Sequence, residues 1–167
     1  MNETYVECLV ARKQNPLSIL IKAAVIAVIS VLVILSLLGI PFTLIVAVVL
    51  GFLAAYLIFP MLSIEYEYLY LDKEITIDKI MSKQKRKRVQ VLDIGKMELL
   101  APSASHEFDS YKSRGVPEKD FSSGYADHKT WYLAYHDENE EALFKLEPDE
   151  DMIRAIRNIA PRKVREF

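Results

Sequence analysis

The hydrophobic pattern is most extreme near the start of the chain, where residues 23–64 carry no charged side chain. This stretch is about twice as long as the ~20 apolar residues that cross a bilayer as one helix. A Gly-Ile-Pro sequence at 39–41 interrupts it, and glycine permits a sharp turn while proline suits the first turn of a helix. The pattern therefore predicts two transmembrane helices, over about 17–38 and 41–61, joined by a very tight turn.

Small residues in this stretch predict how the two helices touch. With a turn centred near residue 40, several small side chains of the first helix lie opposite small side chains of the second. Such residues allow two backbones to approach closely in lipid. We expect them to pack the hairpin; the alternative is that one row of them contacts another protein. The predicted packing residues are Ala27, Ser30, Ala47, Gly51, Ala54 and Ala55.

The residues before the apolar stretch show a helical pattern. Thr4 and Glu7 have the spacing of a capping box, and apolar residues recur on one face after them. This predicts a short amphipathic helix on the inner leaflet, with a frayed tail as the alternative. We therefore divide the chain into an N-terminal amphipathic segment, 1–16, a transmembrane hairpin, 17–62, and a domain, 63–167, that is expected to fold without the hairpin.

From residue 63 onward the period changes from helical to alternating, which is typical of β-strands. Strands are predicted over about 64–70 and 75–81, and a third from about 88 to 100. An irregular segment at 101–127 follows, and a loop of this length in a small domain is unusual. The aromatic residues that we expect to hold it on the sheet are Phe108, Tyr111, Phe121 and Tyr125.

Alternation returns at residue 129 and predicts a second β-hairpin with a polar turn at 137–140. Pro148 then begins a helix with one apolar stripe, and Pro161 ends it. The predicted fold class is a membrane α-helical hairpin plus an α+β domain, in which an antiparallel sheet precedes a C-terminal helix. The sheet core is expected to include Tyr66, Tyr68 and Tyr70.

Charge sets the expected orientation and excludes some partners. Residues 63–167 carry 18 basic and 21 acidic side chains, so this domain is not a general nucleic-acid binder. Basic residues flank the apolar stretch at 12–22 and at 83–88, and the turn between the helices has none. Under the positive-inside rule both termini face the cytoplasm, which predicts a multi-pass protein of the inner cell membrane.

Residues with catalytic chemistry are sparse. The single cysteine, Cys8, rules out an intrachain disulfide and a Cys-rich zinc site. His128 and His136 lie ~26 Å apart along an extended strand, too far to share a metal. Ser123 lacks the sequence context of a nucleophile elbow. We therefore expect no catalytic residue, no metal and no cofactor, and predict a protein that is not an enzyme.

A basic run beside the membrane is the strongest functional signal. Clusters of this kind gain ~1 kcal/mol per basic residue from anionic lipid. Three interpretations stay open: a solvated hairpin end, general attraction to anionic lipid, and a specific site for a headgroup or a protein. The residues of the run are Lys83, Lys85, Arg86, Lys87 and Arg88.

The order of elements, together with residues 70–80 and 86–94, resembles the bacterial pleckstrin-homology-like domain. The whole chain is also similar to a family of uncharacterised, clostridium-like bacterial membrane proteins. The residues that carry this similarity are Asp-Phe-Ser-Ser-Gly at 120–124, Glu-Pro-Asp-Glu-Asp-Met at 147–152 and Ala-Pro-Arg-Lys-Val at 160–164. The resemblance implies a transmembrane hairpin before a cytoplasmic domain, and it implies no activity.

These observations predict a non-enzymatic, membrane-anchored binding or adaptor domain. Its expected partners are the membrane itself, an anionic lipid surface and an unidentified protein, with no nucleic acid. The alternative is a small accessory subunit of a transport or envelope complex that uses the hairpin as its interface. A pore or carrier is poorly supported, because no ionisable residue lies at membrane depth.

Overall fold

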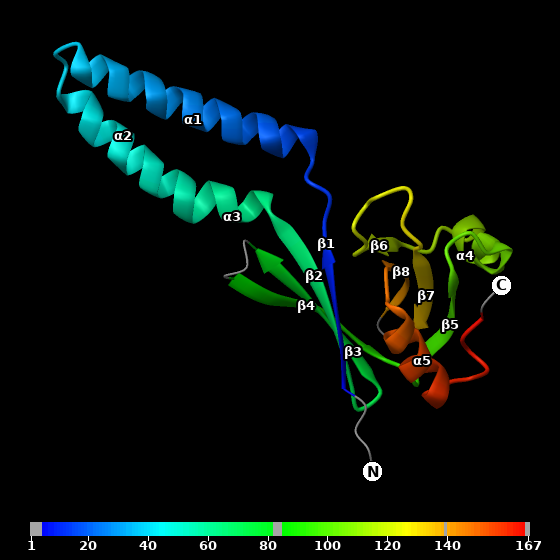
Figure 1. The fold of residues 1–167 in the computed structure, drawn as a ribbon. Coiled ribbons are helices and arrows are strands. Elements are labelled where there is room, and N and C mark those ends of the chain that lie inside the picture. Colours follow the sequence, from blue (N-terminus) through cyan, green and yellow to red (C-terminus); the bar gives the residue numbers. More distant parts are fainter. Residues whose placement is uncertain (1–4, 82–84, 139, 166–167) are drawn as a thin grey trace. The chain divides into compact units, whose positions relative to one another are not determined.

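A computed structural model describes residues 5–81, 85–138 and 140–165 of the 167-residue chain (Figure 1). The chain divides into two compact units. The first, here called the β unit, comprises Met1–Arg12, Glu65–Ile80 and Arg86–Phe167. The second, the helical unit, comprises Lys13–Ile64 and Met81–Lys85.

The helical unit is a hairpin with an unbroken first arm and a segmented second arm. The first arm is α1 (Pro16–Leu37). The second is α2 (Phe42–Leu53), a π-helical segment η1 (Ala54–Ile58) and α3 (Phe59–Leu62). The backbone stays in the right-handed helical region at both junctions of the second arm, so its three pieces form one helical run.

Local signals set the ends of the hairpin's first arm. The side chain of Asn15 accepts a hydrogen bond from the Leu17 amide at 3.1 Å, and Pro16 begins the helix. Gly39 has a φ of 102° in the turn between the arms, a conformation that glycine adopts without steric cost.

Length and composition identify one candidate membrane span. Within the described residues, α1 alone is long and apolar enough to cross a membrane, with a mean hydropathy of 2.8. Only 6% of this span is buried, unlike the core helix of a soluble protein. The apolar stretch Phe42–Ile58 is shorter, so this measure leaves the predicted second span unconfirmed.

The two arms pack large side chains against small ones. The less exposed row of α1 includes Val25, Ile29 and Leu32, whereas Ala47 and Ala54 of the second arm are at most 3% exposed. Large side chains on one helix fill the space above small side chains on the other, so close packing does not need small residues on both helices. This packing corrects part of the predicted set, whose members Ala27, Ser30 and Ala55 are exposed.

Four strands form sheet A of the β unit, in the order β1-β2-β3-β4. They are β1 (Val6–Ala11), β2 (Ile64–Leu71), β3 (Glu74–Met81) and β4 (Lys85–Asp93). The turn between β2 and β3 has two central residues with positive φ, as in the tight turns that join antiparallel strands. As expected, the tyrosines of β2 are buried, with exposures of 4% or less.

The N-terminal segment is a strand, so the predicted amphipathic helix is wrong. β1 pairs antiparallel with β2 from Val6↔Tyr70 to Ala11↔Glu65. Six residues are too few to separate a helical from an alternating pattern, and pairing with β2 decides between them. The hairpin is therefore inserted between two neighbouring strands of one sheet, so β1 belongs with the domain that was predicted to begin at 63. Thr4 of the predicted capping box lies outside the described residues.

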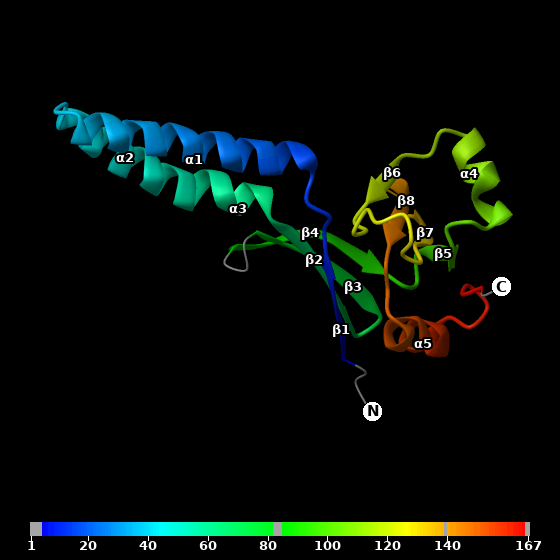
Figure 2. The ribbon, with the colours of Figure 1, turned by 45° about the horizontal axis from the view of Figure 1, so that its top comes forward.

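Sheet B has the order β5-β7-β8-β6 (Figure 2). Its strands are β5 (Met97–Pro102), β7 (Trp131–His136), β8 (Glu141–Leu146) and β6 (Glu118–Asp120). The pairs β5–β7 and β7–β8 are antiparallel, whereas β6 runs parallel to β8. The predicted third strand is thus two strands, β4 and β5, that belong to different sheets.

The segment at 101–127 is built into the core of sheet B. It contains a 3₁₀ turn (His106–Phe108), a short helix α4 (Asp109–Ser113) and β6. Phe108 is fully buried in a cluster with residues of β5, β7 and β8, and Phe121 is also buried. Tyr125 is 41% exposed, so the aromatic residues hold this segment unequally.

The C-terminal helix α5 (Glu150–Ile159) follows β8, close to its predicted position. The side chain of Asp149 accepts a hydrogen bond from the Met152 amide at 2.8 Å and caps the helix. Met152 and Ile156 are buried, so the apolar stripe faces the core. The antiparallel strands and this final helix confirm the α+β class of the β unit.

Candidate functional site

The basic run begins β4, at one defined end of sheet A. Short connections join β2 to β3 and β3 to β4, so the chain reverses twice and β4 starts at the same end as β2. Arg86 contacts Glu67, which pairs with Leu9 close to the Ala11↔Glu65 end of β1. The run therefore starts where the chain passes between sheet A and the hairpin. Lys83 of the predicted site lies outside the described residues.

Two arginines of the run are paired with buried carboxylates. Arg86 forms an ion pair with Glu67, and its Nε lies 3.8 Å from Asp78 Oδ2. The Nε of Arg88 lies 3.9 Å from Asp78 Oδ1. The side chains of Glu67 and Asp78 are only 3% and 5% exposed. Burial raises the pKa of Glu67, and the neighbouring Arg86 charge opposes this rise.

The lysines of the run point the other way. Alternation along a strand places Lys85 and Lys87 on the face opposite Arg86 and Arg88. Both lysines are exposed and form no ion pair with any residue that the structure describes. The four residues of the predicted basic site that the structure describes therefore do not form one surface.

Replacing Arg86 by alanine should lower the free energy of unfolding by about 1–3 kcal/mol, because two buried carboxylates lose their nearest cation. Lys87→Ala is the matched control on the same strand, with an expected change within about 0.5 kcal/mol. Fluorescence of Trp131, the only tryptophan, would follow unfolding in urea. Equal losses for the two variants would contradict this account of the ion pairs.

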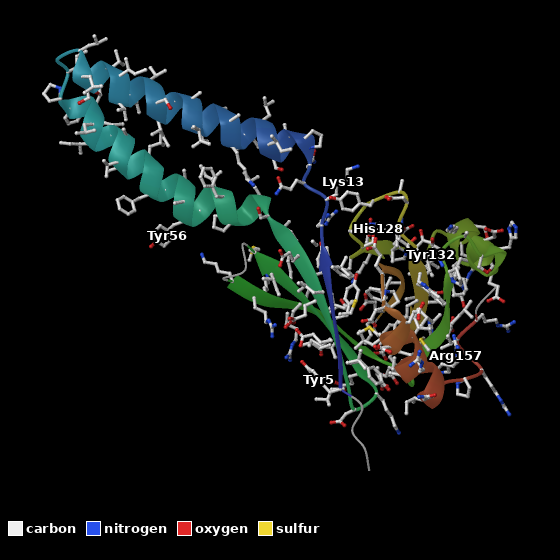
Figure 3. The ribbon with its side chains drawn as sticks, in the orientation of Figure 1. Tyr5, Lys13, Tyr56, His128, Tyr132 and Arg157 are labelled. Carbon is white, nitrogen blue, oxygen red and sulfur yellow. The ribbon has the colours of Figure 1, made fainter. Side chains whose placement is uncertain are left out.

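A groove of about 1360 Å³ runs beside α5. Its walls come from the end of β5, the beginning of β7 and the first turns of α5. Trp131 and Ile153 provide apolar lining, and Arg157, labelled in Figure 3, lies on its helical side. The basic lining residues are Lys129, Arg154 and Arg157, and the lining contains the same number of acidic residues. The groove therefore favours neither positive nor negative charge.

A serine, a histidine and a glutamate meet near this groove, but not as a catalytic triad. The Ser123 hydroxyl donates to Glu147 Oε1 at 2.7 Å and lies 3.2 Å from His128 Nδ1. Glu147 Oε2 lies 3.3 Å from the same Nδ1 atom. A triad needs the acid and the serine on different ring nitrogens. Ser123 is also buried, so we interpret the cluster as an anchor for the segment before β7.

Other reactive side chains stay apart. His106 is exposed and paired with Asp109, and Cys8 is buried with its Sγ 3.6 Å from the Glu147 carbonyl oxygen. Burial raises the pKa of the Cys8 thiol, which disfavours the reactive thiolate. Across the part of the chain that the structure describes, no three His, Cys, Asp or Glu side chains form a metal-binding group.

Comparison with protein-family models matches residues 2–166 to a bacterial PH-like domain family, DUF6106. The chain belongs to this family. The match spans β1, the helical hairpin and both sheets, so the hairpin lies inside the PH-like region that the family model covers. It confirms the PH-like part of the predicted resemblance, whereas the membrane and clostridium-like parts stay predictions. Comparisons with curated proteins and with solved structures find no match.

The sequence analysis identified the basic run of this PH-like protein but did not identify the buried carboxylates that pair with its arginines. Glu67 follows the alternation of β2, which places it opposite the buried tyrosines and predicts exposure. Only the position of β4 beside β3 shows that Arg86 covers it. The sequence analysis also did not identify the hydrogen bond between Ser123 and Glu147, because the two residues lie 24 positions apart in the chain.

Proposed function

We propose that this PH-like protein is a non-enzymatic, membrane-anchored binding domain whose β unit is held at the cytoplasmic face by a hairpin that spans the membrane twice. The observation that carries the proposal is the pairing of β1 with β2 on either side of the apolar hairpin. The β unit then serves as an adaptor for the lipid surface or for a protein partner.

Strand pairing supports two spans over one. β1 and β2 are hydrogen-bonded neighbours, so they lie on the same side of any membrane. A chain that leaves β1 and returns into β2 must cross the bilayer an even number of times. If α1 crosses, the second arm crosses as well. Its helical run from Phe42 to Leu62 measures ~30 Å at 1.5 Å per residue, enough for the hydrocarbon core.

The surface of the hairpin supports a lipid environment. Large apolar side chains cover both arms, among them Leu37, Phe42 and Phe52, each more than 60% exposed. Tyr56 points outward from the second arm (Figure 3). A continuous apolar surface of this extent is rare on a soluble protein and is stable in a bilayer.

Reporter fusions test the two-span topology. A reporter active only outside the cytoplasm should give no signal at either terminus and a strong signal when inserted in the turn at 39–41. The even number of crossings and the basic flanks both lead to this result. A cytoplasmic reporter should give the reverse pattern and serves as the control. An external C-terminus with a cytoplasmic N-terminus would contradict the pairing of β1 with β2 in the membrane-bound protein.

A second candidate function is an accessory subunit of a membrane complex. The observation that favours it is the outward position of Ala27, Ser30 and Ala55, where a helix of another protein can approach closely in lipid. Purification in a gentle detergent separates the two proposals. A stoichiometric membrane partner that is lost on Ala55→Leu replacement would support the second.

A further inference from the structure

We propose that sheet A meets anionic phospholipid headgroups through the Lys85–Lys87 face of β4 alone, while Arg86 and Arg88 are held away from lipid by Glu67 and Asp78. This inference rests on the proposed membrane anchor. It divides the four described residues of the basic run between two faces with different roles.

The two lysines lie at the start of β4. Lys85 is the first residue of β4, at the end of sheet A where the chain passes to the hairpin. A strand advances ~3.3 Å per residue, so Lys87 lies within ~7 Å of Lys85. Attraction to a charged surface at physiological salt is limited by a Debye length of ~8 Å, so the two lysines are close enough together to act on the same patch of lipid.

Charge on the two faces differs. On one face, Arg86 and Arg88 balance the buried carboxylates of Glu67 and Asp78, and the carboxyl group of Glu7 lies beside Glu67. That face offers lipid no surplus positive charge. On the other face, Lys85 and Lys87 have no acidic partner among the described residues.

The lysine face also suits the boundary of a bilayer. Val89 continues this face and is 40% exposed, which places an apolar side chain beside the two ammonium groups. Lysines beside apolar residues hold their charge near phosphates while their methylene stems cover apolar surface. Another basic residue at this end of the sheet, Arg12, is already engaged, because its guanidinium donates to the Tyr66 hydroxyl at 2.7 Å.

Hydrogen exchange of the full chain in nanodiscs tests the proposal. Amides at 85–91 should exchange more slowly in phosphatidylcholine mixed with phosphatidylglycerol than in phosphatidylcholine alone, and added salt should remove the difference. In the Lys85→Gln/Lys87→Gln protein the difference should vanish. This variant removes two exposed charges that have no ion-pair partner among the described residues, so the rest of sheet A should exchange as before.

A second pair of substitutions acts in the opposite direction. Glu67→Gln/Asp78→Asn releases Arg86 and Arg88, and the slowing by anionic lipid should then be larger than in the unchanged protein. An undiminished lipid effect in the Lys85→Gln/Lys87→Gln protein would overturn the proposal. A salt-insensitive effect of one headgroup would overturn it too, in favour of a formed pocket. Loss of the chain from the nanodisc would instead contradict the membrane anchor itself.

Discussion

Joining β1 directly to β2 should give a soluble domain that folds without the hairpin. Ala11 and Glu65 are register partners, so a short glycine-rich turn can replace residues 13–63. We expect a β-rich circular dichroism spectrum and a cooperative melt followed by Trp131 fluorescence. The fragment 63–167, which lacks β1, should lose most of this stability. β1 buries Cys8 and Val10, and burying a side chain such as Val10 contributes about 1.5–3 kcal/mol, against a total of about 5–15 kcal/mol.

Two substitutions in the linked domain serve as a matched pair. Val10→Ala removes a side chain that is 6% exposed, whereas Leu9→Ala removes a neighbour that is 56% exposed. Val10→Ala should lower the melting temperature clearly and Leu9→Ala only slightly, because burial sets the cost. If the fragment 63–167 melted like the linked domain, β1 would not belong to the fold.

Phe108→Ala should be among the most damaging single changes in the β unit. Phe108 is fully buried, and its ring lies 5.3 Å from the ring of Tyr132 in an edge-to-face contact. Removing a buried phenylalanine costs about 3–5 kcal/mol through lost burial and the cavity left behind. Urea unfolding of the full chain in detergent, followed by Trp131 fluorescence, measures this loss.

Tyr125→Ala provides the control within the same segment of the chain. Tyr125 is 41% exposed, so its loss should cost much less than that of Phe108. A small effect of Phe108→Ala would mean that the segment at 101–127 contributes little to the core. A large one would show that this segment forms part of the core of sheet B.

The sequence by itself determined the elements whose causes are local. Asn15 and Pro16 begin α1, Gly39 makes the turn, and Asp149 caps α5, each through contacts within a few residues. The hairpins β2–β3 and β7–β8 also follow from alternation on both sides of a short polar turn. The basic run of the candidate site was visible for the same reason, since it is continuous in the chain.

Tertiary structure decided everything that joins distant residues. β1 pairs with β2 although the whole hairpin lies between them in the sequence. A six-residue pattern does not predict a pairing partner more than fifty residues away. The predicted third strand divides because β4 and β5 pair with different neighbours, and Phe108 becomes core because β7 and β8 lie over it. Arg86 meets its carboxylate partners only when β4 lies beside β3, because burial and charge pairing depend on which strands are neighbours.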